Sequence, residues 1–187
     1  MTRAVPAQEA EPAHRAEDAA DIDAARSGDR AAFDRLYRRY APMVHAVAMA
    51  RAGRGSAEDL VQDVFLKAMA RLGELREAGA FGGWLCAITR NAAASLCRTR
   101  RPQGALPDLG RVGSAEEAGR HAEAEEALDA VLRLPEAYRE TLLMRLVEGM
   151  SGPEIAARTG MTPGSVRVNL HRGMALLRER LGAERQE

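Results

Sequence analysis

Residues 151–172 predict a short helix, a tight turn and a second helix with a basic outer face. Ser151 and Thr162 are residue types that begin helices, and Glu154, three residues after Ser151, predicts a capping box. Pro163 occupies a first helical position, where its missing N–H costs nothing, and Gly160 supplies the turn. A helix-turn-helix of this kind places its second helix in the major groove of DNA.

The second helix of this unit predicts two distinct faces. Its buried stripe consists of apolar residues at helical spacing: Val166, Leu170, Leu177 and Leu181. About half a turn away lie Gly164, Val168, His171, Arg172 and Ala175, with two arginines on the flank, Arg167 and Arg178. Small residues and arginines together can approach base edges and phosphates. A helical hairpin with a merely solvated basic face is the alternative, and the agreement of cap, turn and face favours DNA contact.

The whole chain predicts an all-α fold of two small helical domains joined by a flexible linker. Aromatic residues make up only 4% of the 187 residues, and alanine and leucine dominate the apolar share, which suits packed helices. The expected organisation is a disordered acidic tail over 1–23, a first domain over 24–101, a linker rich in proline and glycine over 102–122, a second domain over 123–182 that holds the helix-turn-helix, and a tail over 183–187.

Local signals divide the first domain into separate helices. Asp29 predicts the cap of one helix, and Pro42 predicts the start of another that ends at Gly53. Ser56 and Asp59 have the spacing of a second capping box, which predicts that the next helix begins there.

A final helix over 84–101 carries no acidic residue at all. Trp84, Asn91 and Arg98 are seven residues apart, so they share one face of this helix. An aromatic ring can stack on a base, an amide can read a base edge and a guanidinium can hold a phosphate, which suits single-stranded nucleic acid. Trp84 alone would be read as an ordinary core anchor; the absence of negative charge favours nucleic acid.

The overall charge and the scattered histidines exclude several functions. The net charge is zero, whereas a protein that holds duplex DNA alone usually carries a basic surplus, so a larger partner is expected to supply much of the affinity. The four histidines have no metal-ligand spacing, and no nucleophile–base set, phosphate loop or membrane-spanning run is visible. We therefore expect a cytoplasmic protein that is not an enzyme, with no cofactor, no metal and no membrane insertion.

Several segments, taken in order, resemble the extracytoplasmic-function sigma factors of bacterial RNA polymerase. They are 57–66, 81–85 with 90–91, 134–135, 155–157 and 166–172. Each piece alone is weak, because a helix-turn-helix also fits other regulators, but their order and spacing are specific. The resemblance implies an alternative sigma factor that binds core polymerase, recognises the minus-thirty-five and minus-ten promoter elements and promotes strand opening.

The resemblance also implies roles for individual residues. The surface that docks on core polymerase comprises Asp59, Gln62, Asp63 and Phe65. The minus-ten element is contacted by Trp84, Arg90, Asn91, Ser95 and Arg98. The minus-thirty-five element is contacted by Ser165, Arg167, Val168, His171 and Arg172. The implied partners are core RNA polymerase, promoter DNA and an anti-sigma factor that covers both DNA-facing surfaces.

Two other classes compete with this interpretation. A free-standing helix-turn-helix regulator would bind duplex operators alone, and a helical adaptor would have no DNA role. The neutral charge, the acid-free helix over 84–101 and the acidic docking face argue against the regulator. The adaptor is distinguished by Arg167→Ala combined with Arg172→Ala, which it predicts to leave promoter-directed transcription unchanged. One residue has no explanation in the sequence. Gly173 lies inside the second helix of the helix-turn-helix, where it lowers helix stability by about 1 kcal/mol relative to alanine.

Overall fold

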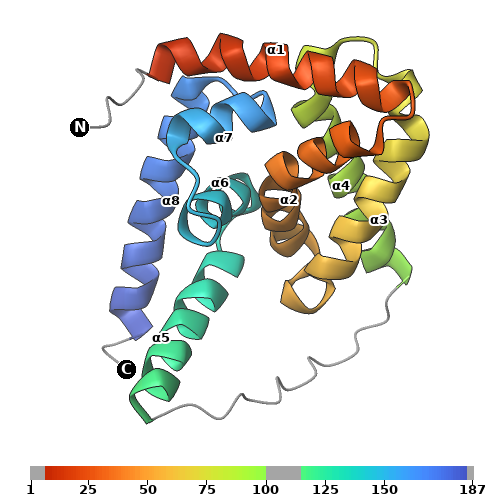
Figure 1. Ribbon diagram of the computed structural model, residues 1–187. Helices are drawn as coiled ribbons and strands as arrows, with labels where there is room; N and C mark the ends of the chain where they lie inside the picture. Colours follow the sequence, from red (N-terminus) through yellow and green to blue (C-terminus); the bar gives the residue numbers. More distant parts are fainter. Residues whose placement is uncertain (1–6, 100–114, 185–187) are drawn as a thin grey trace.

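The computed structural model describes the backbone of residues 7–99 and 115–184, and these residues form helices in two groups (Figure 1). The first domain contains α1 (Ala7–Arg26), α2 (Arg30–Ala52), η1 (Arg54–Ser56), α3 (Ala57–Arg71), η2 (Leu72–Glu74), η3 (Ala78–Ala80) and α4 (Phe81–Thr99). The second domain contains α5 (Ala115–Leu132), α6 (Glu136–Leu146), α7 (Gly152–Thr159) and α8 (Pro163–Glu184). The described residues contain no strand, which confirms the predicted all-α class.

Helix α2 is the centre of the molecule, because it packs against α1, α3, α4 and α6. Asp29 caps its first turn by accepting hydrogen bonds from the backbone N–H groups of residues 31 and 32, as predicted. The prediction that Pro42 starts a new helix is wrong, since α2 runs through it without a break. An internal proline costs about 3 kcal/mol, but α2 buries Leu36, Met43 and Val47 completely, and this packing offsets the loss.

Helix α1 replaces most of the predicted disordered tail. The acidic residues that suggested disorder are partners of basic residues on α2: Asp18 bonds to Arg39 and, at 2.6 Å, to the Tyr40 hydroxyl, and Asp21 bonds to Arg35 at 2.8 Å. Ile22, fully buried, joins the helix to the core. The acidic composition therefore reflects pairing with α2 and not solvation alone.

The boundaries of α3 and α4 differ slightly from those predicted. The single turn η1 precedes α3, and Ser56 has no side-chain capping bond there, so the predicted second capping box does not form. Helix α4 begins at Phe81, three residues earlier than expected, because the buried Phe81 ring packs edge-on against Tyr40 at a centroid distance of 4.9 Å.

The second domain contains the predicted helix-turn-helix, formed by α7 and α8. Ser151 and Glu154 make both bonds of the capping box, and Gly160 ends α7 in the left-handed conformation at φ 74°. Thr162 accepts a hydrogen bond from the N–H of Ser165 at 3.1 Å, which caps α8. These three local predictions are confirmed, whereas α5 begins at Ala115, inside the predicted linker. Residues 102–114 of that linker lie outside the described residues.

Gly173 permits close contact between α8 and α6. A Cβ atom at this position would lie 2.8 Å from Leu142 Cδ1 and 3.1 Å from Tyr138 Cβ. The side chain of Leu142 is fully buried and has no free space to move into. The glycine therefore lets two helices approach more closely than any other residue would allow, which accounts for it.

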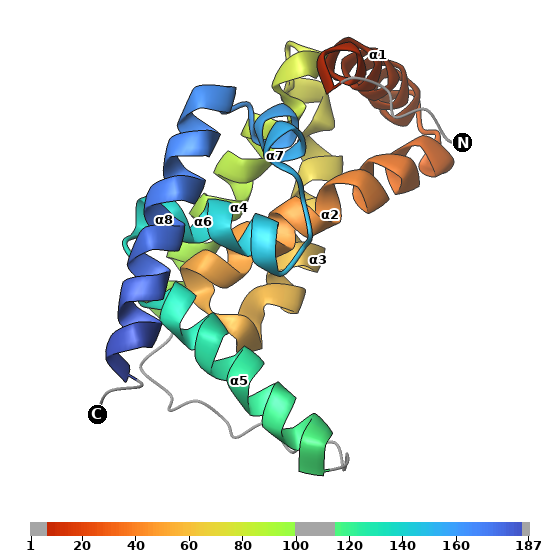
Figure 2. The same cartoon turned by 90° about the vertical axis from the view of Figure 1, so that its left-hand side faces the viewer.

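The two domains pack against each other along α2 and α4 of the first and α6 and α7 of the second (Figure 2). The contact is close at the start of α4, where the backbone of α7 leaves no room for a side chain at Gly82. Within the described residues, no helix is both long enough and apolar enough to cross a membrane.

Candidate nucleic-acid interface

The predicted polymerase-docking residues are split between the surface and the interior. Asp59, Gln62 and Asp63 are exposed on the outer side of α3. Phe65 is only 3% exposed, and its ring packs against Tyr37 at a centroid distance of 4.5 Å. Phe65 thus supports α3 from inside, and an exposed polar surface remains for a partner.

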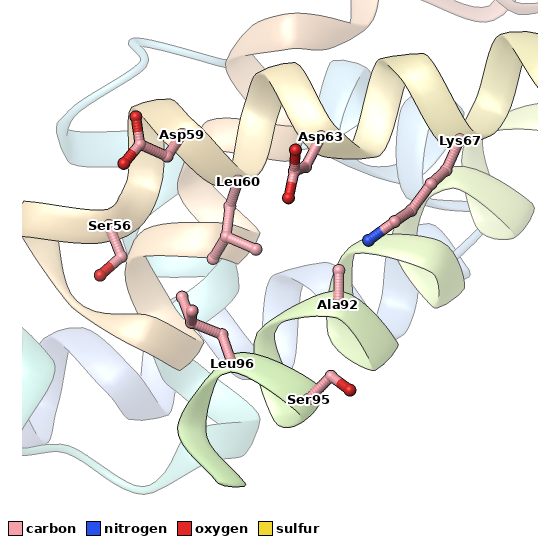
Figure 3. Close-up of a pocket in the computed structure, with 8 residues that line it drawn as sticks. All are labelled: Ser56, Asp59, Leu60, Asp63, Lys67, Ala92, Ser95 and Leu96. Carbon is pink, nitrogen blue, oxygen red and sulfur yellow. The ribbon is translucent and has the colours of Figure 1, made fainter. Parts of the chain in front are cut away.

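A groove of about 250 Å³ separates this surface of α3 from α4 (Figure 3). Asp59, Asp63 and Lys67 line it from α3, and Ser95 lines it from α4. Two of the residues predicted to bind polymerase, Asp59 and Asp63, and one residue predicted to contact the minus-ten element, Ser95, therefore line the same groove.

Four of the five predicted minus-ten residues share one face of α4. Trp84 is half-buried at its start, and its ring packs against Phe81 at a centroid distance of 6.0 Å. Asn91, Ser95 and Arg98 are exposed further along the helix, and Arg98 donates a hydrogen bond to the Ser95 hydroxyl at 3.1 Å. No acidic residue of α4 lies among them, and Arg98 supplies a positive charge near the end of this face.

Arg90, the fifth, points to a different side of α4 and meets the second domain. Its guanidinium donates to both carboxylate oxygens of Glu140 on α6, at 2.6 and 3.1 Å. Burial acts to raise the pKa of Glu140, but the hydrogen bonds and charges of Arg90 and Arg51 lower it overall. Glu140 is consequently a charged carboxylate held between two arginines.

Arg51 and Glu140 are site residues that sequence reasoning missed. Arg51 lies in the last turn of α2 and donates to Glu140 at 2.9 Å, so three charged groups from three helices converge. No local pattern in the sequence reveals this, because the pair is separated by 89 positions along the chain.

The predicted minus-thirty-five residues are all exposed on the first half of α8. They are Ser165, Arg167, Val168, His171 and Arg172. Val166 is 1% exposed and Leu177 is 5% exposed, and they hold the opposite face against the domain. Asn169 ties α8 to the start of α6 by donating to the Ala137 carbonyl at 3.2 Å. The structure therefore brings these five side chains together on one accessible, basic surface.

An all-helical pair of domains, one with an acid-free helix beside an exposed acidic surface and the other with a helix-turn-helix, defines a two-part DNA-binding transcription factor. Comparison with known proteins makes this specific. Residues 36–103 match the sigma-70 region 2 family, and residues 124–177 match the sigma-70 region 4 family. The chain belongs to the extracytoplasmic-function sigma factors, which bind core RNA polymerase and promoter DNA, and it is an alternative sigma factor for promoter recognition in transcription initiation.

Individual relatives agree with this assignment. The chain is 34% identical over 171 residues to the RNA polymerase sigma factor CarQ of Myxococcus xanthus, covering 84% of this chain and 93% of CarQ. It is 31% identical to the ECF RNA polymerase sigma factor SigM of Mycobacterium tuberculosis, covering 90% and 87%. The solved structure of CnrH in complex with the cytosolic domain of CnrY is similar with a TM-score of 0.60 and 27% identity, covering 89% of this chain and 98% of CnrH.

Proposed function

We propose that three separate surfaces divide the work of promoter recognition. Asp59, Gln62 and Asp63 on α3 bind core polymerase, with Phe65 holding the helix in place beneath them. Trp84, Arg90, Asn91, Ser95 and Arg98 on α4 bind the minus-ten element. Ser165, Arg167, Val168, His171 and Arg172 on α8 bind the minus-thirty-five element.

One observation carries this proposal: the exposed cationic or acid-free faces of α4 and α8 belong to different domains of one chain. Two contact surfaces on two domains fit two separated DNA elements, whereas a single operator needs only one helix-turn-helix. The neutral net charge fits a subunit that relies on core polymerase for general affinity. Such a subunit acts in the cytoplasm, binds no substrate and performs no catalysis.

The test compares two exposed arginines of the same helix. Arg172→Ala removes a contact in the proposed reading surface, and Arg180→Ala removes an equal charge two turns further along α8. Loss of one base or phosphate contact costs about 1–3 kcal/mol, so run-off transcription with core polymerase is expected to fall about 5- to 160-fold for Arg172→Ala at limiting factor. Arg180→Ala is expected to keep wild-type transcription.

Equal transcription by both variants would contradict the assignment of α8 to DNA and favour the helical adaptor. Specific binding of duplex promoter by the lone chain at physiological salt, with no gain on adding core polymerase, would favour the free-standing regulator.

We further propose an anti-sigma factor as a regulatory partner. The similar chain CnrH was solved in complex with a cytosolic domain of another protein, CnrY, and matches this chain over 89% of its length.

A further inference from the structure

One exposed side chain on the outer face of α8 is apolar, although polar and basic residues surround it. Val168 is 45% exposed. Its neighbours three and four positions away include Ser165, His171 and Arg172, which are exposed as well. Single apolar residues are common on protein surfaces, so exposure alone assigns no role to Val168. Its position on the helix does.

Val168 lies at the centre of the outward face of α8. Successive residues of an α-helix are rotated by about 100°, which places Val166, Leu170 and Leu177 at about 160° to 200° from this position. Val166 and Leu177 are buried and Leu170 is half-buried, so that direction faces the core. Val168 therefore points directly away from the domain, and α8 lies on the outside of the molecule in both views (Figures 1 and 2).

The residues around Val168 form a small, apolar strip between two basic edges. By the same rotation, the exposed residues Gly164 and Ala175 lie within about 40° of Val168, one before it and one after it along the helix. Arg172 flanks this strip at about 40° on one side, and His171 flanks it at about 60° on the other. The small residues allow the helix to approach a surface closely, while the basic side chains extend at its edges.

Such a face fits the major groove of DNA. The groove is about 12 Å wide and admits one α-helix, which has a diameter of about 10–12 Å. Side chains at the centre of the inserted face meet the base edges, and basic side chains at its borders reach phosphates. The bases present polar atoms to this groove, and thymine alone adds a methyl group. A valine at the centre of the face therefore has one complementary partner among the bases.

We propose that Val168 selects thymine at one position of the minus-thirty-five element by packing its methyl groups against the 5-methyl group of the base. The inference rests on the proposed role of α8, and it adds a base that the element contains. The contact removes apolar surface from water on both sides. Another base at the same place would lose water beside the valine without gaining a hydrogen-bond partner, so Val168 also acts against the alternatives.

Val168→Ser removes both methyl groups without disturbing the fold. Valine and serine have similar helix propensities, and the side chain is exposed. Val147→Ser is the matched control, because Val147 is also 45% exposed and lies in the same domain, directly after α6. The control makes the same chemical change on a different element.

The experiment compares thymine with deoxyuridine, which forms the same base pair but lacks the 5-methyl group. Holoenzyme assembled from core polymerase and the full-length chain selects from a duplex library randomised across both promoter elements, prepared once with each base. The wild type is expected to enrich thymine at one position of the minus-thirty-five element at least, and to enrich deoxyuridine there about fourfold less, the factor expected for burial of one methyl-sized group.

The two variants separate the methyl contact from general effects of deoxyuridine on the duplex. Such effects are shared by all three chains and cancel when the chains are compared. Val147→Ser is expected to match the wild type, whereas Val168→Ser is expected to treat thymine and deoxyuridine alike at that position.

Selection by the wild type that ignores the methyl group at every position would overturn the inference, and so would methyl dependence that survives in Val168→Ser. Loss of minus-thirty-five selection by Arg172→Ala in the same assay would then still support the proposed function of α8, while this inference fails. If the wild-type holoenzyme enriches no sequence at minus thirty-five, the proposed function of α8 is refuted, and the inference is overturned with it.

Discussion

Gly173→Ala tests whether the close approach of α8 and α6 determines the stability of the second domain. The added methyl group would lie 2.8 Å from Leu142 Cδ1, 3.1 Å from Leu142 Cγ and 3.1 Å from Tyr138 Cβ. Leu142 is 0% exposed, so its side chain cannot turn away into solvent. The helices must move apart, or Leu142 must adopt a poorer rotamer.

Two effects of opposite sign set the size of the change. Replacing glycine with alanine inside a helix stabilises it by about 1 kcal/mol. Overpacking a filled core costs about 1–3 kcal/mol. With a central value of about 2 kcal/mol for overpacking, the net result is a loss of about 1 kcal/mol, which lowers the melting temperature of a chain of this size by about 2–4 °C.

Urea denaturation followed by circular dichroism at the helix band measures this loss as a lower midpoint. Gly182→Ala is the matched control: it lies in the same helix, and a Cβ atom there would have no neighbour within 4 Å. This control is expected to be neutral or slightly stabilising. A midpoint for Gly173→Ala as high as that of Gly182→Ala would refute the close-contact argument.

Two further outcomes are expected, one on pH and one on strand opening. His45 of α2 contacts the carboxylate of Glu148, which follows α6, at 2.6 Å. The hydrogen bond with Glu148, followed by the charges of Glu148 and Glu58, raises the pKa of His45 against the effect of burial. Protonated His45 therefore stabilises the folded chain fully below about pH 6.5, and this contribution is lost as pH rises through the raised pKa. The free energy of unfolding, measured by urea denaturation, should accordingly fall over that interval in the wild type, and a Glu148→Gln chain with the same pH dependence would contradict the pairing. Asn91→Ala is expected to reduce transcription from a linear duplex more than from a template already unpaired at minus ten, and equal losses on both templates would count against a role of α4 in opening.

Elements with strong local signals were predictable from the sequence. The helix-turn-helix is one example, because Ser151, Glu154, Gly160 and Thr162 each act within three or four residues of their partners. The buried and exposed faces of α8 follow from helical periodicity alone, which any amphipathic helix on a core obeys.

Elements that depend on partners far away in the chain could not be predicted from the sequence. The acidic residues of α1 suggested a solvated tail, because no nearby sequence pattern indicates that they pair with Arg35 and Arg39 on α2. The break expected at Pro42 is absent because packing on several sides of α2 outweighs a local penalty.

The domain junction shows the same limit at the candidate site. Arg90 could be placed on α4 from the sequence. Its partner Glu140 lies on a helix 50 positions away, so the sequence did not show that a carboxylate pairs with this arginine. A cation that was expected to be open to a ligand is thus covered by a carboxylate of the same chain.

The hydrogen-bonded caps of α7 and the turn that joins it to α8 affect how promoter preference can change. Ser151, Glu154 and Gly160 fix the angle of the two helices through contacts that involve none of the outward side chains of α8. Exchange of Val168 or His171 therefore leaves the frame intact. We expect new promoter preferences to arise from substitution of the exposed residues on one face of α8, without any change in the helices that support it.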